Sequence, residues 1–113
     1  MKLGHRFQIC GIFAALTLAS AIPALADNTG FDSIHAKIRV KGRMCFDGHS
    51  HSGNGSGSSR KAAEAQAVDS WAGFTAGEYG SDWAHIGKAI GRSMRCSQSS
   101  GGWSCDLEAT PCR

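Results

Sequence analysis

Apolar residues recur at helical spacing in the middle of the chain, between positions 59 and 79. Successive members are four, four and three residues apart, which is the pattern of one buried helix face. A serine at position 58 or 59 is suited to the N-cap, and Gly80 to the position just past the last turn. We therefore predict a helix from Ser59 to Tyr79. Its buried stripe comprises Ala63, Ala67, Trp71 and Phe74.

Two further segments alternate between apolar and polar residues, which is the period of a half-buried strand. In the first, from Ser33 to Lys41, Ile, Ala and Val occupy the even positions and His, Lys and Arg the odd ones. In the second, from Trp103 to Ala109, the odd positions carry Trp, Cys, Leu and Ala. We predict one strand in each segment.

The remaining segments are less regular. Residues 52–59 contain only Gly, Ser and Asn, so we predict a flexible loop over 48–58. Residues 83–95 fit either a helix or a strand with a turn near Gly91, and we favour the strand because Gly87 and Gly91 weaken a helix. A hairpin loop is expected over 97–102. The fold class is then α+β, with one helix packed on a small antiparallel sheet in the order β-loop-α-β-β-β, built from residues 33–47 and 59–113.

The N-terminus has the features of an export signal. A basic start at Lys2 and Arg6 is followed by a largely apolar run, and the residues up to Ala26 have the small-x-small form of a cleavage site. We predict removal of residues 1–26, which leaves Asp27 as the first residue of a periplasmic or secreted protein. A transmembrane anchor is the less favoured alternative, because Pro23 and the cleavage site suit a removed segment.

Removal of the signal changes the charge balance. The full chain has 12 Lys and Arg against 9 Asp and Glu, a formal charge of +3. Lys2 and Arg6 leave with the signal, so the formal charge falls to +1. Net charge therefore supplies no argument for binding to nucleic acid or to membranes, and we expect no nucleic-acid partner.

Four cysteines remain after residue 26. An even number in an exported chain indicates two disulfides, which a domain of this size needs because its core is small. Three pairings are possible, and the sequence does not choose among them. A zinc site made of all four is the alternative, but the paired Cys-x-x-Cys spacing is missing. The four residues are Cys45, Cys96, Cys105 and Cys112.

A row of basic residues follows the outer face of the first predicted strand. One interpretation is contact with an anionic surface such as a polysaccharide or lipid headgroups. The other is an exposed edge strand that charge protects from aggregation. We favour the second, because no aromatic residues alternate with the basic ones. The row consists of Lys37, Arg39, Lys41 and Arg43.

The best candidate for chemistry is the pair His49 and His51. Residues two apart in an extended backbone point the same way, so both imidazoles can face one ion, with Asp47 on the same side. Imidazole suits Zn, Cu or Ni, and a carboxylate can complete the ligand set. His35 or His85 would supply a third nitrogen if the fold brings it near. The alternative is two solvated histidines in a flexible loop without a cofactor.

Other chemistry has less support. The Gly/Ser run that enters the helix at Arg60 and Lys61 has the character of an anion-binding helix N-terminus, but it lacks the spacing of a phosphate or dinucleotide loop. Glu78, Asp82 and His85 belong to no catalytic motif, and no serine lies in a nucleophile elbow. We therefore expect a protein that is not an enzyme.

The second half of the chain carries a distinctive order of aromatic, glycine and cysteine residues: Ala63, Trp71, Glu78-Tyr79-Gly80, Trp83, Cys96, Trp103-Ser104-Cys105, Ala109 and Pro111-Cys112. Over residues 60–113 this order resembles a group of small, uncharacterised exported proteins of alphaproteobacteria. The resemblance implies a periplasmic or secreted domain and carries no mechanism. We expect a non-enzymatic binding or structural module of the cell envelope, with metal binding at His49 and His51 as the second hypothesis and a small secreted enzyme as the third.

Overall fold

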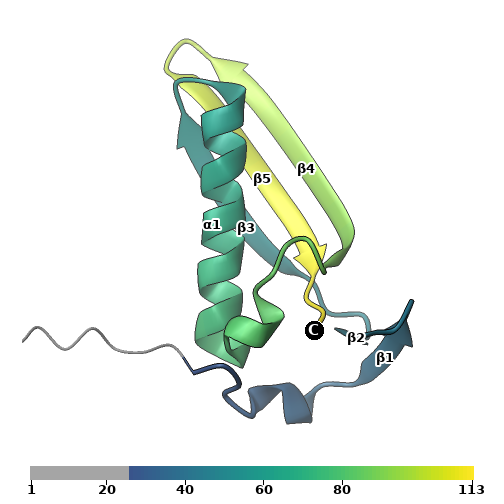
Figure 1. Ribbon diagram of the computed structural model, residues 1–113. Coiled ribbons are helices and arrows are strands. Elements are labelled where there is room, and N and C mark those ends of the chain that lie inside the picture. Colours follow the sequence, from purple (N-terminus) through teal and green to yellow (C-terminus); the bar gives the residue numbers. More distant parts are fainter. Residues whose placement is uncertain (1–25) are drawn as a thin grey trace, which may run out of the picture.

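The computed structural model describes residues 26–113, so the predicted export signal lies outside the described residues except for Ala26. One helix packs on a three-stranded antiparallel sheet, and a separate two-stranded hairpin lies at one end (Figure 1). The predicted disulfide-stapled α+β fold is confirmed. The predicted order β-loop-α-β-β-β is wrong, because within residues 26–113 three strands precede the helix and two follow it. The elements in chain order are η1 (Phe31–Ile34), β1 (Lys37–Val40), β2 (Arg43–Phe46), β3 (His51–Gly57), α1 (Arg60–Tyr79), η2 (Ser81–Trp83), β4 (Ile90–Ser99) and β5 (Gly102–Thr110).

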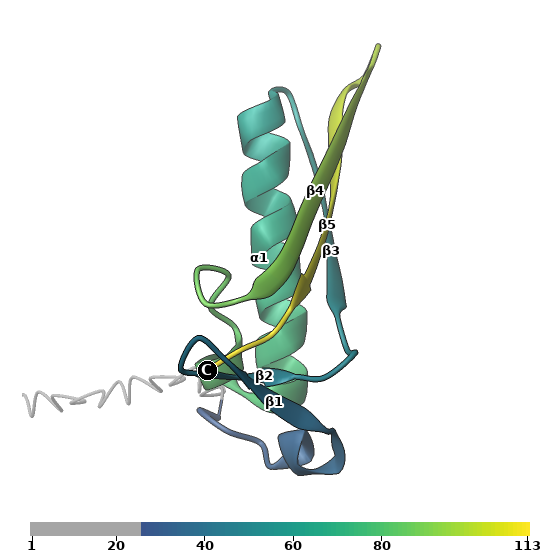
Figure 2. The same ribbon diagram turned by 90° about the vertical axis from the view of Figure 1, so that its right-hand side faces the viewer.

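The main sheet has the strand order β3-β5-β4, with β5 in the centre. Figure 2 shows this sheet on edge, with α1 along one face and no element of the described chain on the other. The uncovered face is polar, as in the row where Ser52 and Ser93 flank Glu108. An antiparallel sheet of this kind buries one face and leaves the other in water.

The predicted loop over 48–58 is wrong, because most of it forms the edge strand β3. Its glycines alternate with exposed Ser and Asn, and Gly53 and Gly55 are buried against α1. A Cβ at Gly53 would collide with the backbone of α1 at Ala67 and Trp71. The glycines therefore allow the strand to lie directly on the helix, where any side chain would hold the two apart.

The predicted helix is confirmed. Ser59 is its N-cap, with Oγ accepting a hydrogen bond from the amide of Ala62 at 3.1 Å. The buried face differs from the prediction in its last third, because it continues through Thr75 and Tyr79 while Phe74 is 57% exposed. The buried residues therefore remain four positions apart to the end of the helix, and Phe74 lies on the side that faces solvent.

The N-terminal strand is shorter than predicted. Residues 31–34 form a 3-10 turn, and β1 starts at Lys37 and pairs with β2 in a hairpin. The hairpin reaches the end of the chain, where Met44 and Arg113 exchange backbone hydrogen bonds of 3.0 and 2.9 Å.

The segment 83–95, for which a helix and a strand were the alternatives, forms a strand only from Ile90 onward. Trp83 ends the short turn η2, and the chain then runs through turns to β4. The predicted turn at Gly91 is instead an irregularity inside β4, where Gly91 has a φ of 61°. The loop between β4 and β5 is also shorter than predicted, because β4 continues to Ser99 and β5 begins at Gly102.

Two clusters fill the interior. The larger lies between α1 and the sheet and includes Trp71 and Leu107, and the smaller consists of Phe46, Tyr79 and Trp83 at the end of α1. The disulfides pair Cys96 with Cys105 across β4 and β5, and Cys45 with Cys112 between β2 and the C-terminus. This pairing excludes the four-cysteine zinc site. Within residues 26–113, no helix is both long and apolar enough to span a membrane.

Candidate functional site

Three histidines meet near the C-terminal end of α1. His51 is the first residue of β3, His49 lies two residues before it, and His35 lies before β1. The rings of His35 and His49 stack with centroids 4.5 Å apart, and those of His49 and His51 meet edge-on at 5.0 Å. Tyr79, the last residue of α1, stacks on His51 at 5.1 Å. The fold thus brings His35, one of the two predicted third ligands, to the predicted pair.

His51 is held by the helix. It is 4% exposed, and its Nδ1 lies 2.9 Å from Thr75 Oγ1. The Thr75 hydroxyl donates its hydrogen to the Trp71 carbonyl oxygen at 2.7 Å, because a carbonyl can only accept. The Thr75 oxygen must therefore accept a hydrogen bond from His51 Nδ1–H. Neutral His51 consequently has a free lone pair on Nε2.

The other two histidines are linked through Tyr79. His49 Nε2 lies 3.1 Å from His51 Nε2 and 2.9 Å from the Tyr79 hydroxyl oxygen, which lies 2.8 Å from His35 Nε2. Two hydrogens serve these three contacts when His49 carries its hydrogen on Nε2 and Tyr79 donates to His35. In this assignment the single His49 Nε2–H is shared between the Tyr79 hydroxyl oxygen and His51 Nε2.

The electrostatics keep His51 uncharged near neutral pH. Burial lowers the pKa of His51, Glu78 raises it, and the neighbouring His49 and His35 lower it further. Neutral imidazole is the form that binds metals. The Glu78 Oε2 atom lies only 3.4 Å from His51 Nε2. A carboxylate that faces a nitrogen lone pair is repelled unless a proton or a cation lies between them.

A surface pocket of about 480 Å³ opens onto His49 and His51. Glu78 and the exposed Phe74 form part of its wall, with the Phe74 ring centroid 4.7 Å from that of His51. The two imidazoles can therefore be reached from solvent, although His51 itself is buried.

The remaining predicted ligands are exposed residues. The amide of Asp47 donates to the Ala36 carbonyl oxygen, and the carboxylate found beside His51 is that of Glu78. His85 is exposed in the turn after η2. Within residues 26–113, no three His, Cys, Asp or Glu side chains already surround one point as ligands of an ion.

The predicted basic row is divided by the fold. Lys37 Nζ binds the carbonyl and carboxylate oxygens of Asp32 at 2.8 and 3.3 Å. Arg39 is exposed on β1, whereas Lys41 and Arg43 lie at the turn between β1 and β2. The row is therefore not one continuous surface of free cations.

Sequence reasoning did not place Thr75, Glu78 and Tyr79 in the site. Glu78 and Tyr79 follow Thr75 by three and four residues, which places them next to Thr75 on one helix face. This spacing was a signal in the sequence that the three side chains lie together. Nothing local connects that face to His49 and His51, because the contacts join residues that are 24 and 30 positions apart in the sequence. The end of α1 supplies the support of the site, and the imidazoles come from the first residue of β3 and from the segments that precede β3 and β1.

The single tyrosine of the chain allows a direct test of this environment. Burial raises the pKa of Tyr79 to about 12, and Glu78 acts in the same direction. Phenolate absorbance should therefore appear near pH 12 in the folded protein, against about 10 for the protein in guanidinium. Because the unfolded chain loses the proton first, stability should fall as pH rises from about 10 to 12. A folded-state midpoint near 10 would show that Tyr79 is not buried.

Comparisons of the chain with protein-family models, with curated proteins and with solved structures found no match. The assignment of a function therefore depends on the geometry of the histidine cluster and on its chemistry.

Proposed function

We propose that this chain is an exported, non-enzymatic binding module that holds a late transition-metal ion at His49 and His51. The observation that carries the proposal is the 3.1 Å separation of their Nε2 atoms. Zn–N bonds of 2.0–2.1 Å at tetrahedral angles place two nitrogens about 3.3 Å apart. The pair is therefore close to the separation that chelation requires, and an ion would replace the hydrogen that lies between them.

The support around His51 favours the same function. Metal-binding histidines usually donate their second ring N–H to a fixed acceptor, which sets the tautomer and the ring orientation. Thr75 performs this role for His51, since its own hydrogen is used by the Trp71 carbonyl. His51 thus directs an unprotonated Nε2 toward His49 before any ion arrives.

Further ligands are within reach of the pair. The Glu78 carboxylate would be relieved of its repulsion with His51 Nε2 by a cation between them. His35 is the third nitrogen, and its Nε2 now faces the Tyr79 hydroxyl, so its recruitment would involve a change of that contact. Imidazoles with a carboxylate suit Cu²⁺, Zn²⁺ and Ni²⁺, with Cu²⁺ expected to bind tightest.

The cellular context is an export route. Two disulfides are typical of proteins that leave the reducing cytoplasm. We therefore assign metal binding to the periplasm or the exterior, where such a domain would act as a metal-handling component of the cell envelope.

The test is calorimetric titration of the oxidised, exported protein with Cu²⁺, Zn²⁺ and Ni²⁺. We expect saturable one-to-one binding that is lost in His49→Ala/His51→Ala. Thr75→Val should weaken binding about 10–100-fold, because it removes the acceptor that orients His51. Affinity should also fall as the pH is lowered, because protons compete with the ion for the imidazole nitrogens.

The matched control is His85→Ala, which removes an exposed histidine away from the cluster. It should bind as the unmodified protein does. His49→Ala alone, at a half-buried position, keeps the test valid if the double variant fails to fold. Absence of saturable binding, or equal binding in the His49 variants, would refute the proposal.

A further inference from the structure

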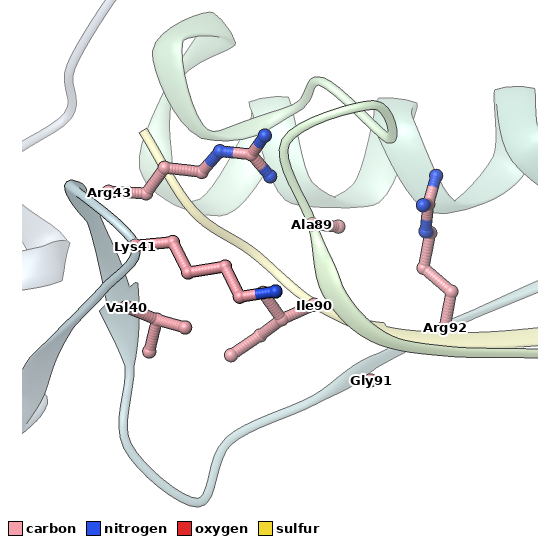
Figure 3. Close-up of a pocket in the computed structure, with 7 residues that line it drawn as sticks. All are labelled: Val40, Lys41, Arg43, Ala89, Ile90, Gly91 and Arg92. Atoms are coloured by element: carbon pink, nitrogen blue, oxygen red, sulfur yellow. The ribbon is translucent and has the colours of Figure 1, made fainter.

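A second concave site lies away from the histidines, where the β1–β2 turn faces the start of β4. It encloses about 570 Å³, a volume typical of small-ligand pockets. Figure 3 shows Lys41 and Arg43 entering from the turn and Arg92 from β4, with Ala89 and Ile90 between them. The lining thus combines three cationic side chains with an apolar floor, to which Val40 also contributes. The guanidinium groups of Arg43 and Arg92 lie on opposite sides of the segment that carries Ala89 (Figure 3).

The turn carries a lysine where its backbone does not favour one. Lys41 and Gly42 have φ of 48° and 81°, which is the pattern of a two-residue type I′ turn. Asn, Asp or Gly is normally found at the first of these positions, since other side chains disfavour a positive φ. The backbone gains nothing from lysine at this position, and the lysine side chain adds a cation to the lining of the pocket.

A bulge in β4 directs the third cation. Ile90 pairs with Thr110 and Ser93 with Glu108, so two residues, Gly91 and Arg92, lie opposite one residue of β5. Gly91 has the left-handed conformation of such a bulge, with a φ of 61°. A bulge re-aims the side chain beside it, and here it turns Arg92 to the pocket.

The two guanidinium groups are anchored to the same turn. Arg43 donates to the Lys88 carbonyl oxygen at 3.0 Å, and Arg92 donates to the Ile86 carbonyl oxygen at 3.4 Å. Each uses one nitrogen in this way, and each guanidinium has further N–H groups to offer. Their positions are therefore set before a ligand binds.

The charge of this pocket is not balanced by the protein. The ion pairs of Lys and Arg formed within residues 26–113 are Lys37–Asp32 and Arg60–Glu64, so none of them neutralises Lys41, Arg43 or Arg92. Like charges that gather in one place repel one another. An anion in the pocket would turn this repulsion into attraction.

We propose that this pocket binds a small organic phosphate. Its phosphate group would be held by Lys41, Arg43 and Arg92, because planar guanidinium groups match phosphate oxygens in paired hydrogen bonds. Its organic part would lie on Val40 and Ile90. A nucleic-acid strand is the less suitable ligand, since the lining contains no aromatic side chain on which a base could stack.

The experiment is calorimetric titration of the oxidised, exported protein with phenyl phosphate at constant ionic strength. We expect saturable binding that is at least tenfold weaker in Arg43→Gln/Arg92→Gln. The matched control, Arg39→Gln/Arg95→Gln, removes the same charge from exposed positions outside the pocket and should change the affinity less than twofold. Equal weakening in both double variants would show nonspecific electrostatic attraction and overturn the proposal.

The substitution Lys41→Asn distinguishes the contribution of the lysine charge to ligand binding from its effect on the stability of the turn. Asparagine tolerates a positive φ better than lysine does, so the melting temperature should be unchanged or higher. Affinity for phenyl phosphate should nevertheless fall several-fold, because one cation is lost. Unchanged affinity would remove Lys41 from the site.

Two further titrations distinguish a small organic phosphate from inorganic phosphate and from the phosphate of a lipid headgroup. Inorganic phosphate should bind at least tenfold more weakly than phenyl phosphate, because it leaves the apolar floor uncovered, and equal affinity would overturn the organic part of the proposal. With the pocket saturated by phenyl phosphate, the protein should bind vesicles of phosphatidylglycerol no more strongly than it binds vesicles of phosphatidylcholine. Binding to anionic vesicles without any binding to phenyl phosphate would make this face a membrane contact and refute the small-ligand pocket.

Discussion

Replacing Gly55 by valine is expected to unfold the protein or to lower its free energy of unfolding by more than about 3 kcal/mol. Gly55 faces α1 from β3, and a Cβ there would collide with the helix backbone at Ala63 and Ala67. Backbone atoms cannot rotate away as a flexible side chain can, so strand and helix would have to separate. Urea denaturation of the oxidised protein, followed by circular dichroism, measures the change.

Two substitutions serve as controls for this experiment. Ser52→Val alters an exposed residue of the same strand, opposite Glu108, and should change stability by no more than about 0.5 kcal/mol. Gly73→Ala should stabilise the protein by up to about 1 kcal/mol, because a Cβ at Gly73 meets open space. If Gly55→Val unfolded at the same urea concentration as Ser52→Val, β3 would not be packed on α1.

The second large effect is expected from the disulfide between Cys45 and Cys112. Its removal in Cys45→Ala/Cys112→Ala should cost about 4 kcal/mol, against about 2–3 kcal/mol for the disulfide between Cys96 and Cys105. The first closes a loop with a sequence separation of 67 and the second one of only 9. Restriction of the unfolded chain grows with loop length, so the longer loop contributes more.

The longer link also has a local role that the shorter one lacks. It joins β2 to the C-terminus, and β2 carries Phe46, whose ring touches those of His35 and His49. Thermal denaturation of the two double variants compares their stabilities, and metal titration tests the histidine site in each. Equal loss of stability in the two variants, with equal metal affinity, would contradict this account.

The assignment of β3 illustrates a limit of sequence patterns. Its residues alternate between glycine and polar Ser or Asn, and the pattern has the period of a strand. Hydrophobic alternation cannot detect it, since the buried positions carry no side chain. Their role depends on the closeness of α1, whose facing residues are the small Ala63 and Ala67.

The histidine site could be predicted only in part, because some of its members come from a distant segment. The spacing of His49 and His51 follows from extended backbone, and their Nε2 atoms do lie 3.1 Å apart. Asp47 was the expected carboxylate because it is near in sequence, whereas Glu78 is near in space. Long-range packing decides such a choice, and a single sequence contains no direct record of it.

Elements whose signals are local could be predicted from the sequence. The helix and its serine cap, the alternation of β5 and the presence of four cysteines after residue 26 follow from short-range spacing and side-chain chemistry. The pairing of the cysteines, the strand in the glycine-rich segment and the exposure of Phe74 follow instead from the packed fold. So does the position of His35, Glu78 and Tyr79 around the histidine pair. These features depend on contacts between distant segments, whose free energy arises only when the helix and the sheet pack together.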